Sequence, residues 1–311
     1  MYERNRLYFE NFKNIYVPLP PHEEQKTIAQ FLDYKIEQIE QYIRNKQRLI
    51  ELLNEQKIAI INRAVTKGIN PELTRIFLEK DLIDVNSESC QLISIRNLRR
   101  MGILEIQDGN HGELHPTSTD YVEEGIPFLM ANDIRNGQVN LKSCTFITKE
   151  KADKLRIGFS KPKDILLTHK GTVGETAIVP DNIGFPYIML TPQVTYYRVL
   201  TKAINPIFLC YCFQSSFFQE QLKIIGSKQS TRAFVGIVAQ RDLIIILPAK
   251  KEQDKICNFL DNETFKINQV IAQVEKEIEL IQEYRTTLIS DAVTGKIDVR
   301  STSAIETTLT A

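Results

Sequence analysis

Three polar stretches of the sequence carry the kinds of side chain that proteins use to contact nucleic acid. The residues concerned are Asn110 and His111, Lys170 and Thr172, and Lys228, Gln229 and Arg232. Lysine and arginine bind phosphates or guanine edges, whereas asparagine and glutamine pair well with adenine. The same residue types are also ordinary in solvated turns. The residues alone therefore leave two interpretations open, a nucleic-acid surface and a set of plain surface loops.

No catalytic motif is recognisable. Residues 171–174, Gly-Thr-Val-Gly, lack the Gly-Lys-Ser/Thr ending with which a P-loop cradles phosphates. Residues 205–208, Asn-Pro-Ile-Phe, differ at the third position from the Asn-Pro-Pro-aromatic motif of adenine methyltransferases, and we interpret them as a helix start. His111 and His115 are four residues apart, but Pro116 opposes the helix that would align them as metal ligands. We therefore predict no catalytic residue, no metal site and no cofactor bound by this chain.

One long segment of the sequence occurs twice, at a constant offset of 228 residues. Leu19 and Leu247 open the two copies, and both copies share the ordered pattern Leu-Pro, Glu-Gln, Ile and Phe-Leu-Asp. They close on Ala-Val-Thr at residues 64–66 and 292–294. This period is too long for a solenoid repeat. The repeat therefore predicts two copies of one structural element on either side of a globular insert.

Each copy contains signals for a strand followed by helix. An apolar run, at residues 14–17 or 243–247, predicts a buried strand that a proline ends. Asp33 and Asp261 are candidate N-caps of a second, longer helix in each copy. Glycines follow each long helix as stop signals, at Gly68 and Gly295.

Both long helices carry an apolar stripe with heptad spacing, which predicts an antiparallel coiled coil. The expected seam residues are Ile39, Ile43, Ile50 and Leu53 in the first copy, and Ile267, Ile271, Ile278 and Ile281 in the second. Lys57 and Arg285 occupy equivalent seam positions. Their aliphatic stems can lie along apolar surface while their charges reach solvent, or they could set the register of the pair.

The insert at residues 71–246 has the pattern of a mixed α/β domain, which places the whole chain in the α+β class. Strands are expected at residues 126–130, 164–168, 176–179, 188–190 and 194–199, with a glycine-containing hairpin turn at 169–174. Pro206 is expected to begin a helix that ends at Gly226. A polar loop is expected to follow at residues 227–232.

Composition narrows the class of protein. The insert holds 20 basic and 19 acidic residues, so any nucleic-acid surface must be a local patch. The sequence shows no signal peptide and no apolar run long enough to span a membrane, which predicts a cytoplasmic protein. The five cysteines lack CxxC spacing and are expected to be reduced. Cys210 and Cys212 lie in an apolar run that predicts burial.

These motifs together resemble those of the specificity (S) subunit of Type I restriction–modification enzymes. They are Asp-Gly-Asn-His-Gly at 108–112, the strand and turn at 164–174, the loop at 226–232, and the Leu-Pro to Phe-Leu-Asp segment before each long helix. The resemblance covers about residues 15–69 and 91–299. It implies that the insert is a target recognition domain that reads half of a bipartite DNA site. It also implies that the repeated helices form an antiparallel spacer that docks methyltransferase subunits.

The chain departs from the family pattern, because a full S subunit has two recognition domains. The segments are interpreted as a remnant of a first recognition domain (1–18), a first repeat with its spacer helix (19–70), one target recognition domain (71–246), a second repeat with its spacer helix (247–298) and a flexible tail (299–311). Arg4 precedes Arg232 by the repeat offset, so the remnant resembles the last loop and strand of a missing domain.

The resemblance implies a non-catalytic subunit that recognises double-stranded DNA and directs modification and restriction subunits to a target site. S-adenosylmethionine, and magnesium with ATP, are expected on those partner subunits. The apolar character of residues 1–18 predicts that a second copy, or a separate recognition-domain chain, completes the site. The alternatives are a coiled-coil structural adaptor, a truncated and non-expressed recombination copy, and a self-sufficient methyltransferase or nuclease, which the missing motifs disfavour.

Overall fold

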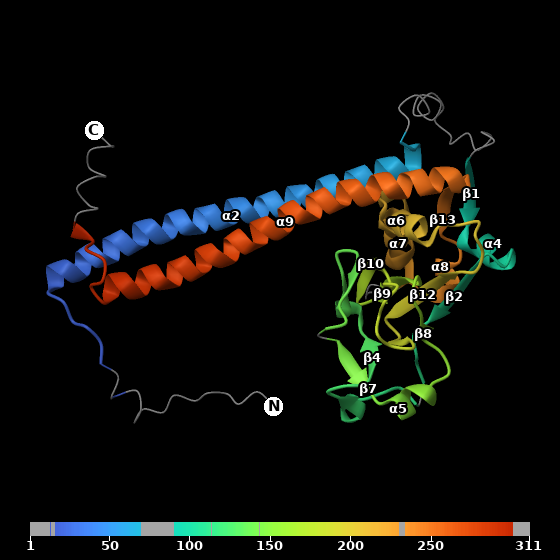
Figure 1. The fold of residues 1–311 in the computed structure, drawn as a ribbon, viewed down its shortest axis with the longest axis horizontal. Coiled ribbons are helices and arrows are strands. Elements are labelled where there is room, and N and C mark those ends of the chain that lie inside the picture. The colour runs from blue at the N-terminus through green and yellow to red at the C-terminus, as the bar shows by residue number, and fades with distance from the viewer. Residues whose placement is uncertain are drawn as a thin grey trace. The chain divides into compact units, whose positions relative to one another are not determined.

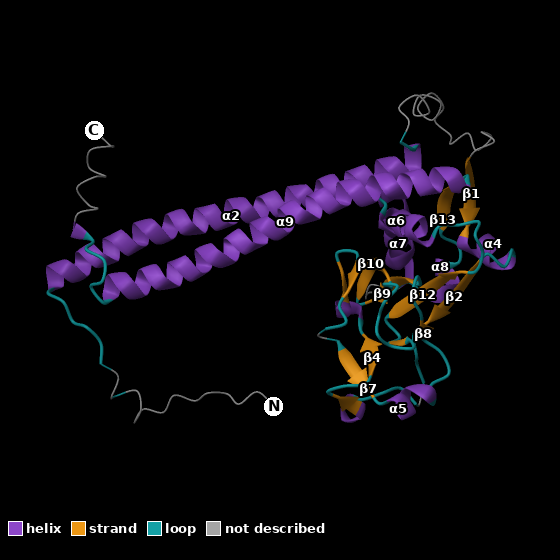
Figure 2. Ribbon diagram, viewed as in Figure 1, coloured by secondary structure: helices purple, strands orange, loops and turns teal. Residues whose placement is uncertain are grey.

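The structure is a computed structural model that describes residue 13 and residues 16–69, 90–112, 114–142, 144–229 and 234–300. It divides into two compact units, one within residues 1–53 and 267–311 and the other within residues 54–266. Figure 1 shows the elements, and Figure 2 shows that the described strands all lie in the second unit. The domain limits expected from the sequence stay predictions.

Each repeat folds as a single continuous helix. Helix α2 is His22–Lys67 and helix α9 is Lys250–Val293. The prediction of separate long helices capped by Asp33 and Asp261 is therefore wrong, since both aspartates lie inside a helix. No proline or glycine interrupts either helix, and acidic residues already stabilise its first turn, so nothing forces a break. The predicted stops are confirmed: Gly68 and Gly295 follow the helices with a φ of +74°.

In the first unit, α2 and α9 lie side by side (Figure 1). Lys46 Nζ lies 2.6 Å from Glu277 Oε2, and Arg285 Nη2 lies 3.3 Å from Glu40 Oε1. The eight residues expected at the seam are all buried or half-buried. Residues outside the stripe, such as Leu280, are exposed. Arg285 is partly exposed, and its charge is paired with Glu40. This agrees with the interpretation in which the charge at this seam position reaches the surface.

The strand predicted at residues 14–17 is wrong in its described part. Tyr16 and Val17 belong to no regular element, and the Tyr16 side chain is 99% exposed. The corresponding run of the second copy does form a strand, β13 (Ile244–Pro248), because β1 (Cys90–Ser94) pairs with it antiparallel. Residues 1–12, 14 and 15 lie outside the described residues, so the remnant domain stays a prediction.

The second unit contains two main sheets. The four-stranded sheet has the order β10 (Thr172–Ile178), β9 (Ile165–Lys170), β12 (Val194–Val199) and β2 (Leu104–Asp108), with every pairing antiparallel. The five-stranded sheet has the order β3 (Tyr121–Val122), β7 (Thr145–Ile147), β4 (Ile126–Leu129), β11 (Ile188–Leu190) and β8 (Phe159–Ser160). Its β4 and β11 are parallel. A small hairpin joins β5 (Ile134–Arg135) to β6 (Gln138–Val139). The mixed α/β character predicted for the insert is confirmed.

The helices of this unit are short. They are α4 (Ile95–Arg100), α5 (Lys149–Asp153), α6 (Pro206–Gln214), α7 (Ser216–Gln229) and α8 (Ile237–Gln240), with 3-10 turns η1 (Ser118–Asp120) and η2 (Ala131–Asp133). Pro206 begins α6 as predicted, behind the N-cap Asn205. The predicted single helix ending at Gly226 is wrong, because Ser215 interrupts it and α7 continues to Gln229. The Ser215 hydroxyl accepts the N–H of Phe218 at 3.4 Å, which starts a new helix.

The four-stranded sheet separates two apolar clusters. Alternation along β9 directs Ile165 and Leu167 into the cluster that holds α6 and α7, and Leu166 into the cluster toward the five-stranded sheet. Cys210 and Cys212 are buried in the first cluster, as predicted. Burial raises the pKa of the Cys210 thiol to about 12. Among the described helices, none is both long and apolar enough to cross a membrane.

Candidate nucleic-acid interface

The hairpin turn that carries Lys170 lies at one end of the four-stranded sheet. Lys170 ends β9 and forms a β-bridge with Phe234. The Val235 N–H donates to the His169 carbonyl at 2.9 Å. The hairpin turn therefore borders the chain that follows residue 233. Lys228 and Gln229 end helix α7 rather than lying in the predicted loop; their side chains, and Arg232, lie outside the described residues.

The hairpin turn between β9 and β10 is open to solvent. Gly171 has a φ of +80°, and no atom lies within 4 Å of the position that a Cβ would take there. Lys170 is exposed and Thr172 is half-buried. The register then shifts between Val173 and Thr176, which is the irregularity of a β-bulge. The predicted glycine hairpin is thus confirmed, and it presents an exposed lysine at its tip.

The loop after β2 is closely packed at its base. The Asn110 N–H donates to the Leu190 carbonyl at 2.7 Å, and His115 Nδ1 lies 3.1 Å from the Asn110 carbonyl oxygen. The Asn110 side chain is buried, with Nδ2 3.5 Å from His115 Nδ1, whereas His111 is exposed. In this structure His111 is therefore the loop residue that faces solvent, and base contact by Asn110 stays a prediction. Among the described residues no group of metal-ligating side chains converges.

A first polar network lies on the β2 and β12 face that meets α8. The Thr195 hydroxyl donates to Asp108 Oδ1 at 2.6 Å, and Gln240 Nε2 donates to the Thr195 Oγ1 at 3.2 Å. Gln240 Oε1 accepts the Tyr197 hydroxyl proton at 2.7 Å. Gln240 and Tyr197 are fully buried. This chain of bonds fixes the end of β2, from which the loop at residues 109–112 departs.

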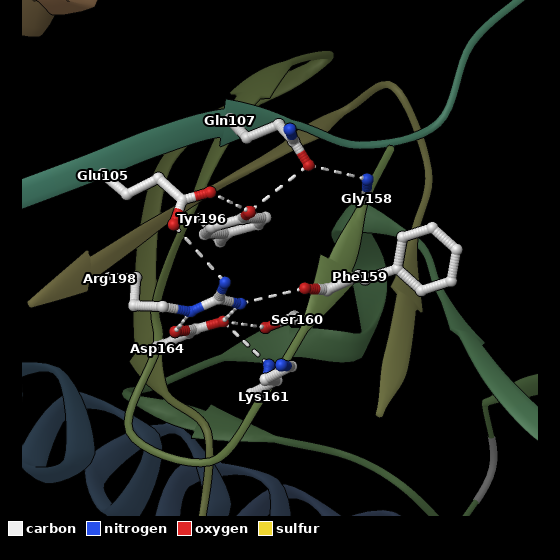
Figure 3. A network of polar contacts seen from close by, with 9 residues as sticks. All are labelled: Glu105, Gln107, Gly158, Phe159, Ser160, Lys161, Asp164, Tyr196 and Arg198. Atoms are coloured by element: carbon white, nitrogen blue, oxygen red, sulfur yellow. Dashed lines mark hydrogen bonds and ion pairs between the residues drawn. The ribbon is translucent and has the colours of Figure 1, made fainter. Parts of the chain in front are cut away.

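A second polar network lies on the opposite face of the same strands (Figure 3). Arg198 Nε and Nη2 donate to the two Asp164 carboxylate oxygens at 2.8 and 2.7 Å, and Nη2 also donates to the Phe159 carbonyl at 2.9 Å. Burial opposes the charge of Arg198, but the Asp164 carboxylate outweighs it and raises the pKa of the guanidinium. The network thus ties the four-stranded sheet to β8 of the five-stranded sheet.

Gln107 extends this second network to the loop. Its Oε1 accepts the Tyr196 hydroxyl proton at 3.2 Å and the Gly158 N–H at 3.2 Å. Gly158 lies directly against the loop, since a Cβ placed on it would be 2.7 Å from the Asn110 nitrogen. The sequence motifs did not identify this network. The alternation of Glu105 and Gln107 with apolar residues in β2 was the signal that could have indicated it.

A second hairpin, which was not expected from the sequence, lies beside β10. Asn136 and Gly137, with φ of +53° and +81°, form the turn between β5 and β6. Glu175 of β10 accepts the Asn136 N–H at 3.3 Å and pairs with Arg135 at 3.3 Å. The Asn-Gly dipeptide is itself a strong hairpin signal. A cavity of about 600 Å³ opens beside the turn, and its lining includes Asn136, Lys57 and Lys223.

Known proteins share the sequence pattern and the fold of this chain. Residues 2–52 and 100–280 match the family described as Type I restriction modification DNA specificity domain. The chain belongs to this family. The match covers the larger part of both repeats and nearly all of the sheets.

Curated relatives of the specificity-domain family are similar along most of the chain. The specificity subunit of the Type I restriction enzyme MjaVIII from Methanocaldococcus jannaschii is 25% identical over 93% of this chain. The specificity subunit of the Type I restriction enzyme EcoBI from Escherichia coli is 24% identical over 90% of it. The chain spans only 64% and 58% of the lengths of these two relatives.

Solved structures of the specificity-domain family show the same fold. A chain from work on complex assembly and conformational transition of the type I R-M system has a TM-score of 0.60 at 15% identity, covering 89% of this chain and 60% of that chain. The S subunit of a Type-I restriction-modification system from M. genitalium has a TM-score of 0.50 at 15% identity, covering 92% and 65%. At 15% identity, these two similarities show a common fold and nothing more.

Proposed function

We propose that this chain is a DNA-recognition and scaffold subunit of a Type I restriction–modification complex, carrying one target recognition domain at residues 71–246. Membership of the DNA specificity domain family is the observation that carries the proposal. The arrangement at the end of the four-stranded sheet supports it. There an exposed lysine turn and an exposed histidine loop stand on a base that two hydrogen-bonded networks hold rigid.

The face is suited to reading DNA by loops. Lys170 provides a charge for phosphate at a turn that no neighbouring side chain crowds. His111 provides an exposed imidazole ring whose nitrogens can donate or accept a hydrogen bond. The net charge of the insert is close to balance, so binding relies on this local arrangement rather than on the total charge. Lys228, Gln229 and Arg232 complete the proposed face.

The partners are proposed to be double-stranded DNA, modification subunits and restriction subunits. Helices α2 and α9 are proposed to form an antiparallel coiled coil whose outer surfaces dock the modification subunits. Apolar side chains exposed on these helices, such as Tyr34, Leu280 and Tyr284, support this role because exposed apolar surface is typical of protein interaction sites. The chain itself is proposed to be non-catalytic, with S-adenosylmethionine, magnesium and ATP held by its partners. A second copy, or a separate recognition-domain chain, stays a prediction.

Replacing Lys170 by alanine tests the proposed DNA face. The purified variant, with its modification subunit, is expected to bind DNA several-fold more weakly than the wild type. The slope of log K against log salt is expected to become less negative by about one, because one phosphate contact is lost. Titration of a fluorescent duplex at several salt concentrations measures both.

Lys149→Ala is the control, because Lys149 is another exposed lysine of the same unit, on α5, where it pairs with Asp153. It is expected to leave affinity and salt slope unchanged. Equal behaviour of the Lys170 and Lys149 variants would remove the turn from the interface.

Purified without any modification subunit, the chain is expected to transfer no methyl group from S-adenosylmethionine. Methyl transfer by the chain alone would overturn the non-catalytic assignment.

Replacing Ile278 by aspartate tests the helix pair as a docking element. Ile278 is half-buried on the stripe of α9, so a carboxylate there is expected to lower the free energy of unfolding by about 1–3 kcal/mol. Co-purification with modification subunits is expected to be lost, and Ile50→Asp on α2 is expected to behave alike. Glu279→Ala, at the exposed neighbouring position, is the control. Normal stability and co-purification in both aspartate variants would refute the coiled coil.

A further inference from the structure

His169 is a buried, titratable residue to which the proposed DNA face assigns no role. It precedes Lys170 on β9, and its side chain is 3% exposed. Among the described residues neither of its ring nitrogens has a well-aligned hydrogen-bond partner, although backbone groups of Val235 and of His169 itself lie near the ring. Its Nε2 lies 3.5 Å from Asp108 Oδ1. A buried imidazole costs free energy when its polar atoms lack partners, so its presence here calls for a reason other than packing.

The backbone and ring of His169 join two segments of the proposed face. Its N–H donates to the Gln193 carbonyl and its carbonyl accepts the Val235 N–H, both at 2.9 Å. Its ring packs against the Phe234 ring, with centroids 5.8 Å apart. Phe234 in turn forms the β-bridge with Lys170. The position of the lysine turn is therefore linked through His169 to the chain that follows residue 233.

Asp108 links the same ring to the third segment. Asp108 is the last residue of β2, two positions before Asn110. Its Oδ1, which faces the His169 ring, also accepts the Thr195 hydroxyl proton at 2.6 Å. Thr195 continues through Gln240 to Tyr197 in the interior. The ring therefore stands where the lysine turn, the loop after β2 and the Phe234 segment meet.

The charges around the ring favour its neutral form. Burial lowers the pKa of His169, the Asp108 carboxylate partly opposes this, and Lys170 lowers the pKa further. Tyr197 of β12 is the other titratable group near Asp108, and burial keeps its pKa well above the usual value. A neutral ring carries one N–H, and the tautomer with that proton on Nε2 directs it at Asp108. The ring can thus link the segments without adding a second positive charge beside Lys170.

We propose that His169 is a positioning residue for sequence reading: it holds the lysine turn, the loop at residues 109–112 and the Phe234 segment in one mutual arrangement. It acts on which base pairs are read by positioning these segments and makes no phosphate contact itself, because a ring this buried does not reach DNA. The inference rests on the proposed function, since it concerns the geometry of that DNA face.

Selection from a randomised duplex library tests the inference with the full chain bound to its modification subunit. His169→Phe keeps a ring against Phe234 but removes the nitrogen that faces Asp108. It is expected to relax the selected motif by about tenfold at one or more positions, an amount typical of a mismatched base pair. Its affinity for random duplex is expected to change less than about twofold, with an unchanged salt slope. His169→Gln places an amide nitrogen near the former Nε2 and is expected to restore the wild-type motif.

Two further variants separate positioning from folding. Asp108→Ala removes both oxygens that could accept the ring N–H and is expected to relax the same positions as His169→Phe. Tyr187→Phe removes a hydroxyl that bonds Asp153 beside α5, away from the proposed face, and is expected to keep the motif. If His169→Phe does not fold, Asp108→Ala decides: the wild-type motif in a folded Asp108→Ala variant overturns the inference. The wild-type motif in folded His169→Phe overturns it as well.

The same selection distinguishes a failure of the proposed function from a failure of the inference. Wild-type chain that selects no motif, while its complex is intact, overturns the proposed function, and the inference falls with it. Wild-type chain that selects a motif, together with variants that select the identical one, overturns only the role of His169. Equal relaxation by His169→Phe and His169→Gln also contradicts the inference, because the amide nitrogen of glutamine would then fail to replace the ring nitrogen that faces Asp108.

Discussion

Replacing Asp164 by alanine is expected to lower the free energy of unfolding by about 3–5 kcal/mol, the range found when one partner of a buried ion pair is removed. Asp164 is 1% exposed. Its carboxylate accepts two bonds from Arg198, one from the Ser160 hydroxyl at 3.1 Å and one from the Lys161 N–H at 2.7 Å. Alanine would leave the half-buried guanidinium with the more distant Glu105 carboxylate, 3.5 Å from Nη1, and with the Phe159 carbonyl. Urea-induced unfolding followed by circular dichroism measures the change.

Two variants show whether the ion pair is responsible. Lys161→Ala keeps the backbone N–H that Asp164 accepts and changes only an exposed side chain. It is expected to stay within about 0.5 kcal/mol of the wild type. The double variant Asp164→Ala with Arg198→Met is expected to recover part of the loss, because no uncompensated charge remains. A single Asp164 variant as stable as the Lys161 variant would contradict the assignment of this network as the clamp between the sheets.

Replacing Gly109 by alanine is expected to destabilise the chain by at least about 3 kcal/mol and to weaken DNA binding together with it. A Cβ at this position would lie 1.9 Å from the Thr191 carbonyl oxygen and 2.7 Å from that of Leu190. Both are backbone atoms, so the strands themselves must separate. That movement breaks the Gly109 N–H bond to the Val194 carbonyl and the Asn110 N–H bond to the Leu190 carbonyl. Unfolding and duplex titration measure the two effects.

Gly102→Ala provides the comparison for Gly109→Ala. Gly102 has a φ of +68°, and no atom lies within 4 Å of the position that an alanine methyl group would take, so only conformational strain opposes alanine there. That strain is expected to cost about 1 kcal/mol, and DNA affinity is expected to stay unchanged. If the two alanine variants were equally stable, the close approach of the loop base to residues 190 and 191 would not be what fixes the loop.

The elements of the chain that depend on local patterns could be predicted from the sequence. Heptad spacing, and glycines at residues 68 and 295, indicated the long helices and their ends, because helix periodicity and C-capping act within a few residues. The strands and the Gly171 turn followed from apolar runs and a residue suited to positive φ. Local signals failed at three places: Asp33 lies inside a continuous helix, Tyr16 has no described strand to pair with, and α7 continues past Gly226.

The residues of the candidate site also divide into those that lie at the surface, as the sequence predicts, and those that do not. Lys170 and His111 were chosen for their chemistry, and the structure places both at the surface. Asn110 was chosen on the same ground, but the crossing of the chain at Leu190 and His115 buries it. No motif predicts the roles of His169 and Arg198, because a side chain that positions others shows its role only once its neighbours are known; for Gln107 the alternation along β2 is the one indication.

The repeat, the long helices, the apolar strands and the membership of the specificity-domain family all follow from residue order. The contacts of Asp108 with Thr195 and of Asp164 with Arg198, pairs separated by 87 and 34 residues, become visible only in the folded domain. Such meetings depend on the strand order β10-β9-β12-β2 and on its register. A shift of one residue would turn every side chain to the other face of the sheet, and that choice is made by the packing of the whole domain.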